Sequence, residues 1–346
     1  MRIVLVGGGV EPIPPPGYGG TERFIADLRT ALERAGEEVS VVNRVRHRRM
    51  RDEYPFAWEL PGLLRHERFD VVHANSPVVG NRLAGQHIPY VYTSHSRHWF
   101  YRDRLSHRWG YWLERRAVRR AAASVALTEP LARAMTAAAG PLRRAPTVIP
   151  FGVDSEQFRP DWDRRNGSVA LGVGVVAPFK RWEVAAEALR GTGVRFELAG
   201  PTPDPEYAAR VRSAGDDVRL LGELSPEALA ARFAASDLLV HPSRVELLSG
   251  VVVQGLAAGL PVVGGPAVAA AVEEGRTGYV IDDADRGAFV RGLRDRTVAL
   301  AADPALRRRM GDAARATAQE RFAWPRIVEQ YVAVYRSVAG LGGGAA

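Results

Sequence analysis

The sequence predicts an α/β protein that consists of two doubly wound domains, each a parallel sheet covered by helices. Short apolar segments typical of strands alternate with helical segments, and this alternation occurs twice along the 346 residues. A polar segment that contains proline and glycine, residues 151–167, separates the two series. Such a composition is typical of a domain boundary. We therefore expect two domains with a cleft between them.

The expected strands of the first series are residues 3–6, 39–42, 71–74, 90–93, 125–128 and 148–149. Those of the second series are residues 169–176, 196–199, 220–221, 238–241, 262–263 and 279–281. Between the first two strands we expect a helix over residues 21–35. It places Phe24, Ile25 and Leu28 on one face and closes at Gly36, as helical spacing and a C-terminal glycine require.

The composition excludes several classes of protein. Hydrophobic residues make up 46% and charged residues 25%, which is ordinary for a soluble globular chain. The apolar runs are shorter than the roughly 18 residues of a membrane-spanning helix, and MRIVLVGGG indicates a first strand rather than a signal peptide. Without cysteine there is no disulfide and no thiolate site, so we expect a cytoplasmic protein. A net charge of +8 favours anionic partners.

Three loops follow expected strands at their carboxyl ends, where open α/β sheets bind ligands. The first loop, residues 7–24, carries Gly19 and Gly20 at the start of a helix. Backbone N–H groups at a helix N-terminus suit a phosphate. The loop lacks the G-x-G-x-x-G fingerprint of dinucleotide binding, so a different anionic ligand is expected.

The second loop holds Lys180, the single lysine among 47 basic side chains. A lysine kept in so arginine-rich a chain indicates a need for a compact ammonium group. The third loop, residues 241–265, carries Glu246 ahead of a short helix that begins near Ser249. A loop position lets Glu246 reach a ligand, with Gln254 facing it from the helix.

Together these segments resemble, in order, the motifs of the glycosyltransferases of family 4. PPPGYGGTE resembles the first loop of that family, and DVVHANSP and YTSHS resemble strands of its N-terminal domain. VIPFGVDSEQFRP resembles its interdomain segment and GVGVVAPFK its phosphate-binding loop. PSRVELLSGVVVQGLAAGLPVV resembles the donor motif with two glutamates, and GRTGYVID the strand that follows. Motifs in this order over most of the chain are specific.

The resemblance implies a GT-B fold, in which two Rossmann-like domains face a central cleft. We expect an acceptor-binding domain at residues 1–155, a donor-binding domain at 156–322, and a helix at 323–340 that packs back on the first domain. The implied reaction moves a sugar from a nucleotide-diphosphate donor to a hydroxyl group, with retention of configuration and without a metal or other cofactor. The acceptor is open: a small molecule, a glycan or a lipid-linked sugar.

The resemblance also implies roles for single residues. Lys180 contacts the donor diphosphate, Glu246 holds hydroxyls of the donor sugar, and His95 lies near the anomeric carbon. The donor-binding residues share positions in the glycine-rich loops and the donor motif: Gly19, Gly20, Gly174, Arg181, Ser249, Gly250 and Gln254. The acceptor-side residues are Tyr18, Asn75 and Ser96. No metal ligand is implied.

Two departures from the family pattern bear on activity. Val175 follows Gly174 where the family usually has arginine, and Gln254 stands where it has a second glutamate. We therefore expect strong dependence on Lys180, with help from Arg181. A relative without transfer activity and a sugar-nucleotide epimerase of the same fold stay open as alternatives. Asp283-Ala284-Asp285 matches the D-x-D metal motif, but its position after the last strand predicts a surface turn.

A basic aromatic stretch, residues 98–120, contains arginines interleaved with tryptophan and tyrosine, and residues 44–51 add further arginines. Three interpretations stay open: a helix with its aromatic residues in the core, peripheral docking at the inner face of an anionic membrane, or an anionic acceptor. Nucleic-acid binding is the alternative from another class of function. It does not explain the two α/β series, so we expect no nucleic-acid partner.

Overall fold

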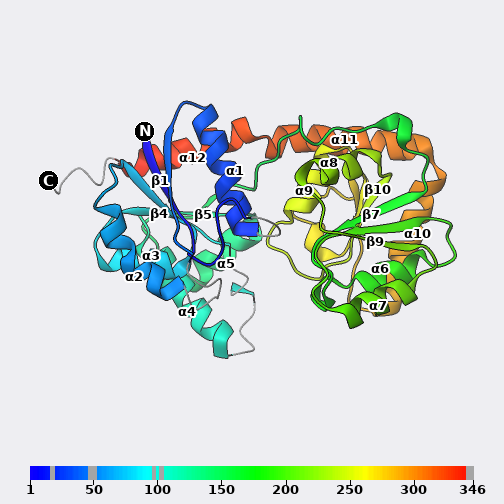
Figure 1. Ribbon diagram of the computed structural model, residues 1–346, viewed down its shortest axis with the longest axis horizontal. Helices are drawn as coiled ribbons and strands as arrows, with labels where there is room; N and C mark the ends of the chain where they lie inside the picture. The colour runs from blue at the N-terminus through cyan, green and yellow to red at the C-terminus, as the bar shows by residue number, and fades with distance from the viewer. Residues whose placement is uncertain (16–19, 46–52, 96–98, 101–104, 340–346) are drawn as a thin grey trace. The chain divides into compact units, whose positions relative to one another are not determined.

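The computed structural model describes residues 1–15, 20–45, 53–95, 99–100 and 105–339. The chain divides into two compact units, which are Met1–Gly152 with Trp324–Ala346, and Val153–Ala323. In the described residues each unit contains a six-stranded parallel sheet (Figure 1). The predicted pair of doubly wound sheets is therefore confirmed.

The first unit alternates strands and helices from its start and receives the last helix of the chain. Its elements are β1 (Arg2–Val6), α1 (Gly20–Arg34), β2 (Glu38–Val42), α2 (Glu53–Leu64), β3 (Val71–Ala74), α3 (Pro77–Gly85), β4 (Tyr90–Thr93), α4 (Leu105–Arg120), β5 (Ala123–Ala126), α5 (Glu129–Ala139), β6 (Thr147–Val148) and α12 (Trp324–Ala339).

The strands of the first sheet lie in the order β2-β1-β3-β4-β5-β6. The chain leaves β1 toward β2 and then crosses to β3 on the other side, so the order reverses between β1 and β3. Strands β3 and β4 are buried throughout because helices cover both faces. Figure 1 shows α1 (blue) and α12 (red) on one side of this sheet and α2, α3 and α4 on the other.

The last helix belongs to the core of the first unit. Ile327, Tyr331 and Tyr335 of α12 are fully buried and pack in one cluster with Phe24 and Leu28 of α1. The ring of His73 on β3 lies between the hydroxyls of Tyr335 (2.8 Å) and Thr93 (2.7 Å). Hydrogen bonds inside an apolar core specify one docking position, because misplacement leaves buried polar groups without partners.

The second unit repeats the same alternation. Its elements are β7 (Val169–Val173), α6 (Trp182–Leu189), β8 (Arg195–Ala199), α7 (Pro205–Ala214), β9 (Val218–Gly222), α8 (Pro226–Ala235), β10 (Leu238–His241), α9 (Gly250–Ala257), β11 (Val262–Gly264), β12 (Gly278–Val280), α10 (Arg286–Ala302) and α11 (Pro304–Phe322). The sheet order is β12-β11-β10-β7-β8-β9, which reverses between β7 and β10. Figure 1 shows α6, α7 and α10 on one face and α8, α9 and α11 on the other.

Caps and glycines set the ends of these elements. Ser225 and Asp303 accept the backbone N–H three residues on and are followed directly by proline, which begins a helix readily. The strand expected at 169–176 ends earlier, at Val173, because Gly174 turns out of the sheet with φ of 144°. A side chain is strained at this backbone conformation, so glycine is required there.

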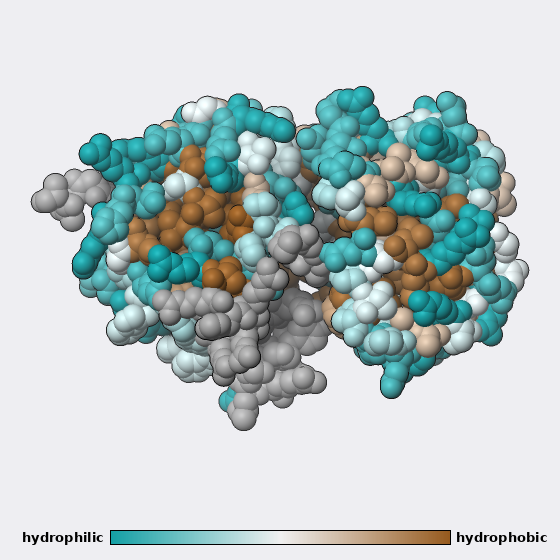
Figure 2. Space-filling view, viewed as in Figure 1, coloured by the Kyte–Doolittle hydropathy of each residue, from teal (hydrophilic) through white to brown (hydrophobic). Residues whose placement is uncertain are grey.

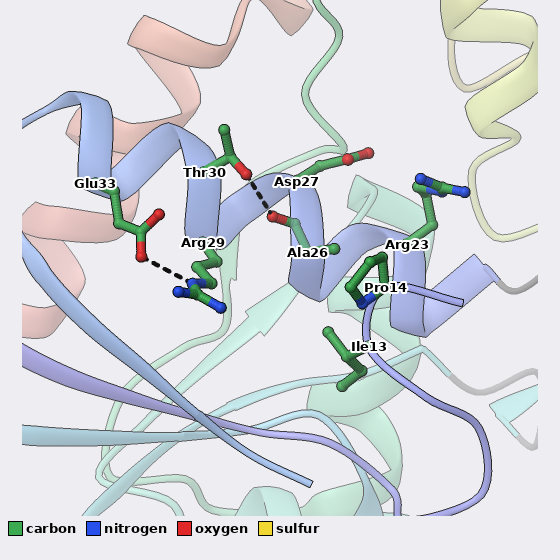
Figure 3. Close-up of a pocket in the computed structure, with 8 residues that line it drawn as sticks. All are labelled: Ile13, Pro14, Arg23, Ala26, Asp27, Arg29, Thr30 and Glu33. Atoms are coloured by element: carbon green, nitrogen blue, oxygen red, sulfur yellow. Dashed lines mark hydrogen bonds and ion pairs between the residues drawn. The ribbon is translucent and has the colours of Figure 1, made fainter. Parts of the chain in front are cut away.

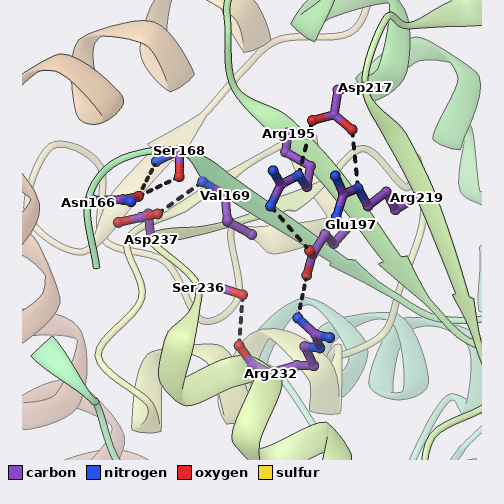
Figure 4. Close-up of polar contacts among 10 residues, drawn as sticks. All are labelled: Asn166, Ser168, Val169, Arg195, Glu197, Asp217, Arg219, Arg232, Ser236 and Asp237. Carbon is purple, nitrogen blue, oxygen red and sulfur yellow. Dashed lines mark hydrogen bonds and ion pairs between the residues drawn. The ribbon is translucent and has the colours of Figure 1, made fainter. Parts of the chain in front are cut away.

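The amino-terminal edge of the second sheet is held by polar contacts (Figure 4). Asp237, which is 1% exposed, accepts the N–H groups of Gly167 (2.6 Å) and Val169 (3.0 Å). On β8 the buried Glu197 lies 3.1 Å from the guanidinium of Arg232. These contacts connect neighbouring segments and pair every charge that they bury. They point to a structural role for this edge.

Figure 2 shows hydrophobic residues gathered over the sheet of each unit, with hydrophilic residues over the flanking helices. Among the described helices, none combines the length and the apolar character that crossing a bilayer demands.

Candidate functional site

The order of strands in the second sheet brings two predicted loops together. Strands β7 and β10 are neighbours at the point where the order reverses. The loop after β7 carries Lys180, and the loop after β10 carries Glu246. In open α/β sheets the crevice for a ligand lies at this reversal, beyond the carboxyl ends of the strands. The candidate site of the second unit is built here.

Lys180 ends a 3₁₀ turn, Pro178–Lys180, and its side chain is 6% exposed. A β-carbon placed on Gly174 would lie 3.6 Å from Cε of Lys180 and 3.4 Å from the ring of Trp182. Both are ordinary van der Waals distances, so glycine is required at position 174 by its φ of 144° and not by lack of space.

Lys180 forms an ion pair with Oε1 of Glu246. The same oxygen accepts the hydroxyl of Ser243 at 3.1 Å and lies 3.7 Å from Nε2 of His241. Among the described residues, these three groups contact the carboxylate through Oε1. The second oxygen, Oε2, is not used in these contacts and has acceptor capacity for a hydroxyl group.

Burial by itself would raise the pKa of Glu246, but the neighbouring His241 and the charge of Lys180 outweigh burial and lower this pKa to about 2. Glu246 is consequently ionised near pH 7. The site combines a fixed carboxylate with a fixed ammonium group, and both are largely removed from water. Such groups interact more strongly with a ligand than exposed charges do.

His241 is a residue that the sequence analysis did not single out. It ends β10, is fully buried, and packs edge-on against Trp182 with ring centroids 6.1 Å apart. Burial lowers the pKa of His241, so the ring is neutral near pH 7. Neither ring nitrogen has a hydrogen-bond partner in the described part of the chain. The sequence signal that could have identified His241 is its position directly before Pro242-Ser243, where the donor motif begins.

Arg181 adopts the left-handed backbone conformation, with φ of 58°. Its guanidinium donates to the carbonyl of Pro242 (2.8 Å) and to Asp283 (2.8 Å), and it lies over the ring of Phe289. These contacts connect the Lys180 loop with the loop that carries Glu246. The two sequential cations therefore have different surroundings: Lys180 contacts Glu246, and Arg181 contacts the scaffold around it.

The Asp283-Ala284-Asp285 turn contributes to this scaffold. Asp283 accepts from Arg181 and, at 3.1 Å, from Arg244, and its side chain is 13% exposed. Asp285 caps α10 by accepting the N–H of Ala288. Each carboxylate thus has a protein partner that explains its position.

The helix after Glu246 begins as the sequence predicts. Ser249 is the N-cap of α9 and accepts the N–H of Val252, and Gly250 is the first helical residue. Gln254 lies one turn further along and is half-buried. The first N–H groups of α9 have no partner within the helix, and they follow the Glu246 loop directly in the chain.

In the first unit, two predicted residues meet at the carboxyl edge of the sheet, beyond the neighbouring strands β3 and β4. Asn75 follows β3 and His95 follows β4, and Oδ1 of Asn75 lies 3.1 Å from Nε2 of His95. Because an amide oxygen only accepts, Nε2 carries the proton and Nδ1 is left as an acceptor. Nδ1 is buried without a hydrogen-bond partner among the described residues. Burial lowers the pKa of His95 to about 3.

Further predicted residues lie around this pair or outside the described residues. Gly20 opens α1, and a β-carbon there would meet nothing within 4 Å. The residue is exposed at the start of this helix. Tyr18, Gly19 and Ser96 lie outside the described residues.

Two carboxylates near the same edge have altered acidity. Glu53 opens α2 and is hydrogen-bonded to Ser76, the residue after Asn75. Burial raises the pKa of Glu53, and burial together with the charge of Glu11 raises that of Glu22 on α1. The carboxyl edge of the first sheet therefore combines amide, imidazole and carboxyl groups, which suits recognition of hydroxyl groups.

A shallow groove of about 310 Å³ lies along α1 (Figure 3). It is lined by Ile13, Pro14, Arg23, Ala26, Asp27, Arg29, Thr30 and Glu33. Arg29 and Glu33 pair with each other at 2.8 Å on the outer face of the helix. None of the predicted site residues lines this groove, so we do not assign it to the candidate site.

Two family models match the chain. The model described as Glycosyltransferase Family 4 matches residues 18–157, and the model described as Glycosyl transferases group 1 matches residues 173–296. Together they include the loops that carry Lys180 and Glu246 and the end of the first loop from residue 18.

Curated and solved proteins resemble the chain as well. A D-inositol 3-phosphate glycosyltransferase from Streptomyces avermitilis is 34% identical over 220 residues, which are 54% of this chain and 46% of that protein. The match thus spans about half the length of that relative. A sucrose-phosphate synthase from Thermosynechococcus elongatus has a TM-score of 0.81 at 20% identity, over 98% of this chain and 99% of its own.

A second structural neighbour is HepE of Anabaena, whose structure was determined in complex with UDP and glucose. Its TM-score is 0.75 at 20% identity, and the match covers 97% of this chain and 100% of that chain. At these identities the likeness shows the fold alone. The predicted GT-B fold of two Rossmann-like units is confirmed.

Proposed function

Because the chain belongs to glycosyltransferase family 4, we propose that it transfers a sugar from a nucleoside-diphosphate donor to a hydroxyl group of an acceptor. The configuration at the anomeric carbon is retained, and no metal ion takes part. The observation that carries the proposal is the buried ion pair of Lys180 and Glu246 at the reversal of the second sheet. Opposite charges at one ligand crevice fit a substrate that is anionic at one end and rich in hydroxyls at the other.

In this proposal the two charged side chains bind different parts of the donor. Lys180 binds the diphosphate, and Glu246 accepts hydroxyl groups of the sugar through Oε2 while Lys180 and Ser243 hold Oε1. Negative charge grows on the leaving phosphate in the transition state. A fixed cation aimed at that charge contributes on the order of 10²- to 10³-fold in rate. The N–H groups at the start of α9 add partial positive charge of the same sign.

On the acceptor side, His95 and Asn75 offer fixed hydrogen-bonding groups. Nδ1 of His95 accepts a hydroxyl group, which orients it for attack at the anomeric carbon. A neutral imidazole fits this role, since the pKa of His95 is about 3. We assign the proton of the attacking hydroxyl to the leaving phosphate oxygen, so the protein supplies positioning and charge.

UDP sugars are the first donors to test, because the structural neighbour from Anabaena was determined with UDP and glucose. Thermal unfolding is measured with UDP, GDP, ADP, dTDP and their sugars, for the wild type and for Lys180→Ala. A ligand that binds the native state raises the midpoint of unfolding by mass action. We expect one nucleotide class to stabilise the wild type, and Lys180→Ala to lose this response.

The matched control is Arg286→Ala, which removes an exposed cation of the same unit that pairs with Glu187. It is expected to keep the full response to the donor. An equal loss in both variants would contradict the assignment of Lys180. Stabilisation by nucleotide sugars without transfer to any acceptor, together with conversion of the sugar itself, would favour the epimerase alternative.

We also propose the cytoplasmic face of a membrane as the place of reaction. Arginine and tryptophan side chains on the first unit support this location, and they are independent of the donor chemistry.

A further inference from the structure

Helices α2 and α4 carry four large, exposed aromatic side chains, here called the aromatic ridge: Tyr54, Trp58, Trp109 and Trp112. We propose that the aromatic ridge, with the arginines around it, docks the first unit on a bilayer that contains anionic phospholipids. This inference deepens the proposed location of the enzyme, but its evidence does not depend on the transfer reaction.

Direct contacts connect three members of the ridge, Tyr54, Trp109 and Trp112. The rings of Trp109 and Trp112 are stacked, with centroids 5.1 Å apart. Nε1 of Trp109 donates to the hydroxyl of Tyr54 at 3.0 Å. Tyr54 and Trp58 are one turn apart on α2, where residues at this spacing share a face. The ridge therefore has a defined geometry rather than being a set of scattered side chains.

These aromatic side chains are unusually exposed. The exposed fraction is 73% for Trp58, 54% for Trp109, 47% for Tyr54 and 46% for Trp112. Single exposed apolar residues are normal, but a contiguous exposed patch of large ones marks an interaction site. Tryptophan and tyrosine combine an apolar ring with a polar group, which suits the boundary between lipid headgroups and acyl chains.

The burial of side chains on α4 shows which face of this helix is exposed. Leu113, Ala117 and Val118 of α4 are buried, whereas Trp109 and Trp112 face outward. For these two tryptophans the interpretation that places the aromatic residues in the core is wrong. Trp99, by contrast, is 5% exposed and donates to Ser94 in the interior.

The charges around the ridge favour an anionic partner. The exposed basic residues of α4 are Arg108, Arg115, Arg116, Arg119 and Arg120. The one acidic residue of α4, Glu114, is fully buried and accepts from Tyr92 and Ser94. Arg82 of α3 lies over the ring of Trp58 (4.5 Å) and Arg116 over that of Trp112 (5.8 Å). Each arginine near an anionic membrane contributes about 1 kcal/mol to binding, or about fivefold.

The position of the ridge connects docking with the acceptor. Tyr54 follows Glu53, which is hydrogen-bonded to Ser76 at the carboxyl edge of the first sheet. The ridge thus begins within one residue of the edge that holds Asn75 and His95. A bilayer bound at the ridge presents hydroxyl groups of its own lipids, or of lipid-linked sugars, next to this edge.

Flotation with vesicles tests the proposal on the full chain. Vesicles of phosphatidylcholine alone are compared with vesicles of phosphatidylcholine mixed with phosphatidylglycerol. We expect binding only to the mixed vesicles, lost at high salt, with a blue shift of tryptophan emission. Trp109→Ala/Trp112→Ala should bind the mixed vesicles more weakly and show a smaller shift, which Trp58 still reports. Arg115→Ala/Arg116→Ala should weaken binding by about 25-fold.

Arg308→Ala/Arg309→Ala on α11 is the matched control for loss of two arginines, and it should bind as the wild type does. Equal binding to both kinds of vesicle, or full binding by the ridge variants, would overturn the proposal. Absence of vesicle binding with concentration-dependent self-association that requires Trp109 would overturn it in favour of a second copy. Stabilisation by the donor nucleotide should be unchanged in the ridge variants, so failure of docking and failure of the proposed transfer give different results.

Discussion

Lys180 and Glu246 form a buried ion pair although 66 residues separate them in the sequence. The pair exists because β7 and β10 are neighbours in the sheet and their loops leave it at the same edge. Removing water from two charges is unfavourable, so their position at a ligand crevice calls for a reason beyond stability. Binding a donor with an anionic and a polyhydroxyl end supplies that reason.

Loss of one partner of this pair should destabilise the second unit. Lys180→Met leaves Glu246 buried without its ammonium partner, and breaking such a pair lowers the free energy of unfolding by about 3 kcal/mol. The double variant Lys180→Met/Glu246→Gln should recover part of that loss, because no charge is left unpaired. Urea unfolding of the single and double variants measures the coupling. Equal unfolding free energies in the two variants would contradict an interaction between these residues.

The decrease in the free energy of unfolding at acid pH should depend on Glu246. Its pKa is lowered to about 2 in the folded chain, below the value of about 4.3 in an unfolded one. The stabilisation is therefore complete above about pH 5 and is lost as the pH falls toward 2, by on the order of 3 kcal/mol. Unfolding measured between these pH values should be flatter in Glu246→Gln than in the wild type. An unchanged slope would show that Glu246 has an ordinary pKa.

Two substitutions of Arg181 separate the effect of backbone strain on stability from the effect of its side-chain contacts. Both Arg181→Ala and Arg181→Gly lose the bonds to Pro242 and Asp283, but only glycine adopts φ of 58° without strain. The glycine variant should be more stable than the alanine variant by about 1 kcal/mol. Both should raise the KM for the donor equally, because the tie between the two loops is missing in each.

Asp283→Asn changes the partner of Arg181 and so tests the same contact between the two residues. It should raise the KM for the donor in the wild type and have little further effect in Arg181→Gly. Additive effects of the two changes would mean that they act separately.

His241 should act on the donor through Glu246. His241→Phe keeps a ring against Trp182 but removes the nitrogen 3.7 Å from Oε1 of Glu246. We expect the pKa of Glu246 to rise, so that stability begins to fall at a higher pH on acidification. We also expect a raised KM for the donor. His241→Asn, which keeps a polar group at this place, is expected to restore part of the donor affinity. A loss of stability whose dependence on acid pH is unchanged would indicate that His241 has a packing role only.

The sequence alone predicted the two α/β series and the loops that carry Lys180, Glu246 and His95. These are local properties: strand and helix periodicity is set by neighbouring residues, and a loop after a parallel strand must lie at the carboxyl edge. The motifs of family 4 added roles to residues already placed on those loops.

Which of these residues meet depends on the packing of the whole fold. The order of strands puts the loops of Lys180 and Glu246 side by side, and it buries His241 between them, because strand neighbours are not encoded in local periodicity. The left-handed Arg181 depends on contacts with Pro242 and Asp283, distant in sequence. On α4, arginine and tryptophan recur on a helix whose inward face is selected by packing against the sheet and α3, so burial of Leu113 and exposure of Trp109 could not be read from spacing.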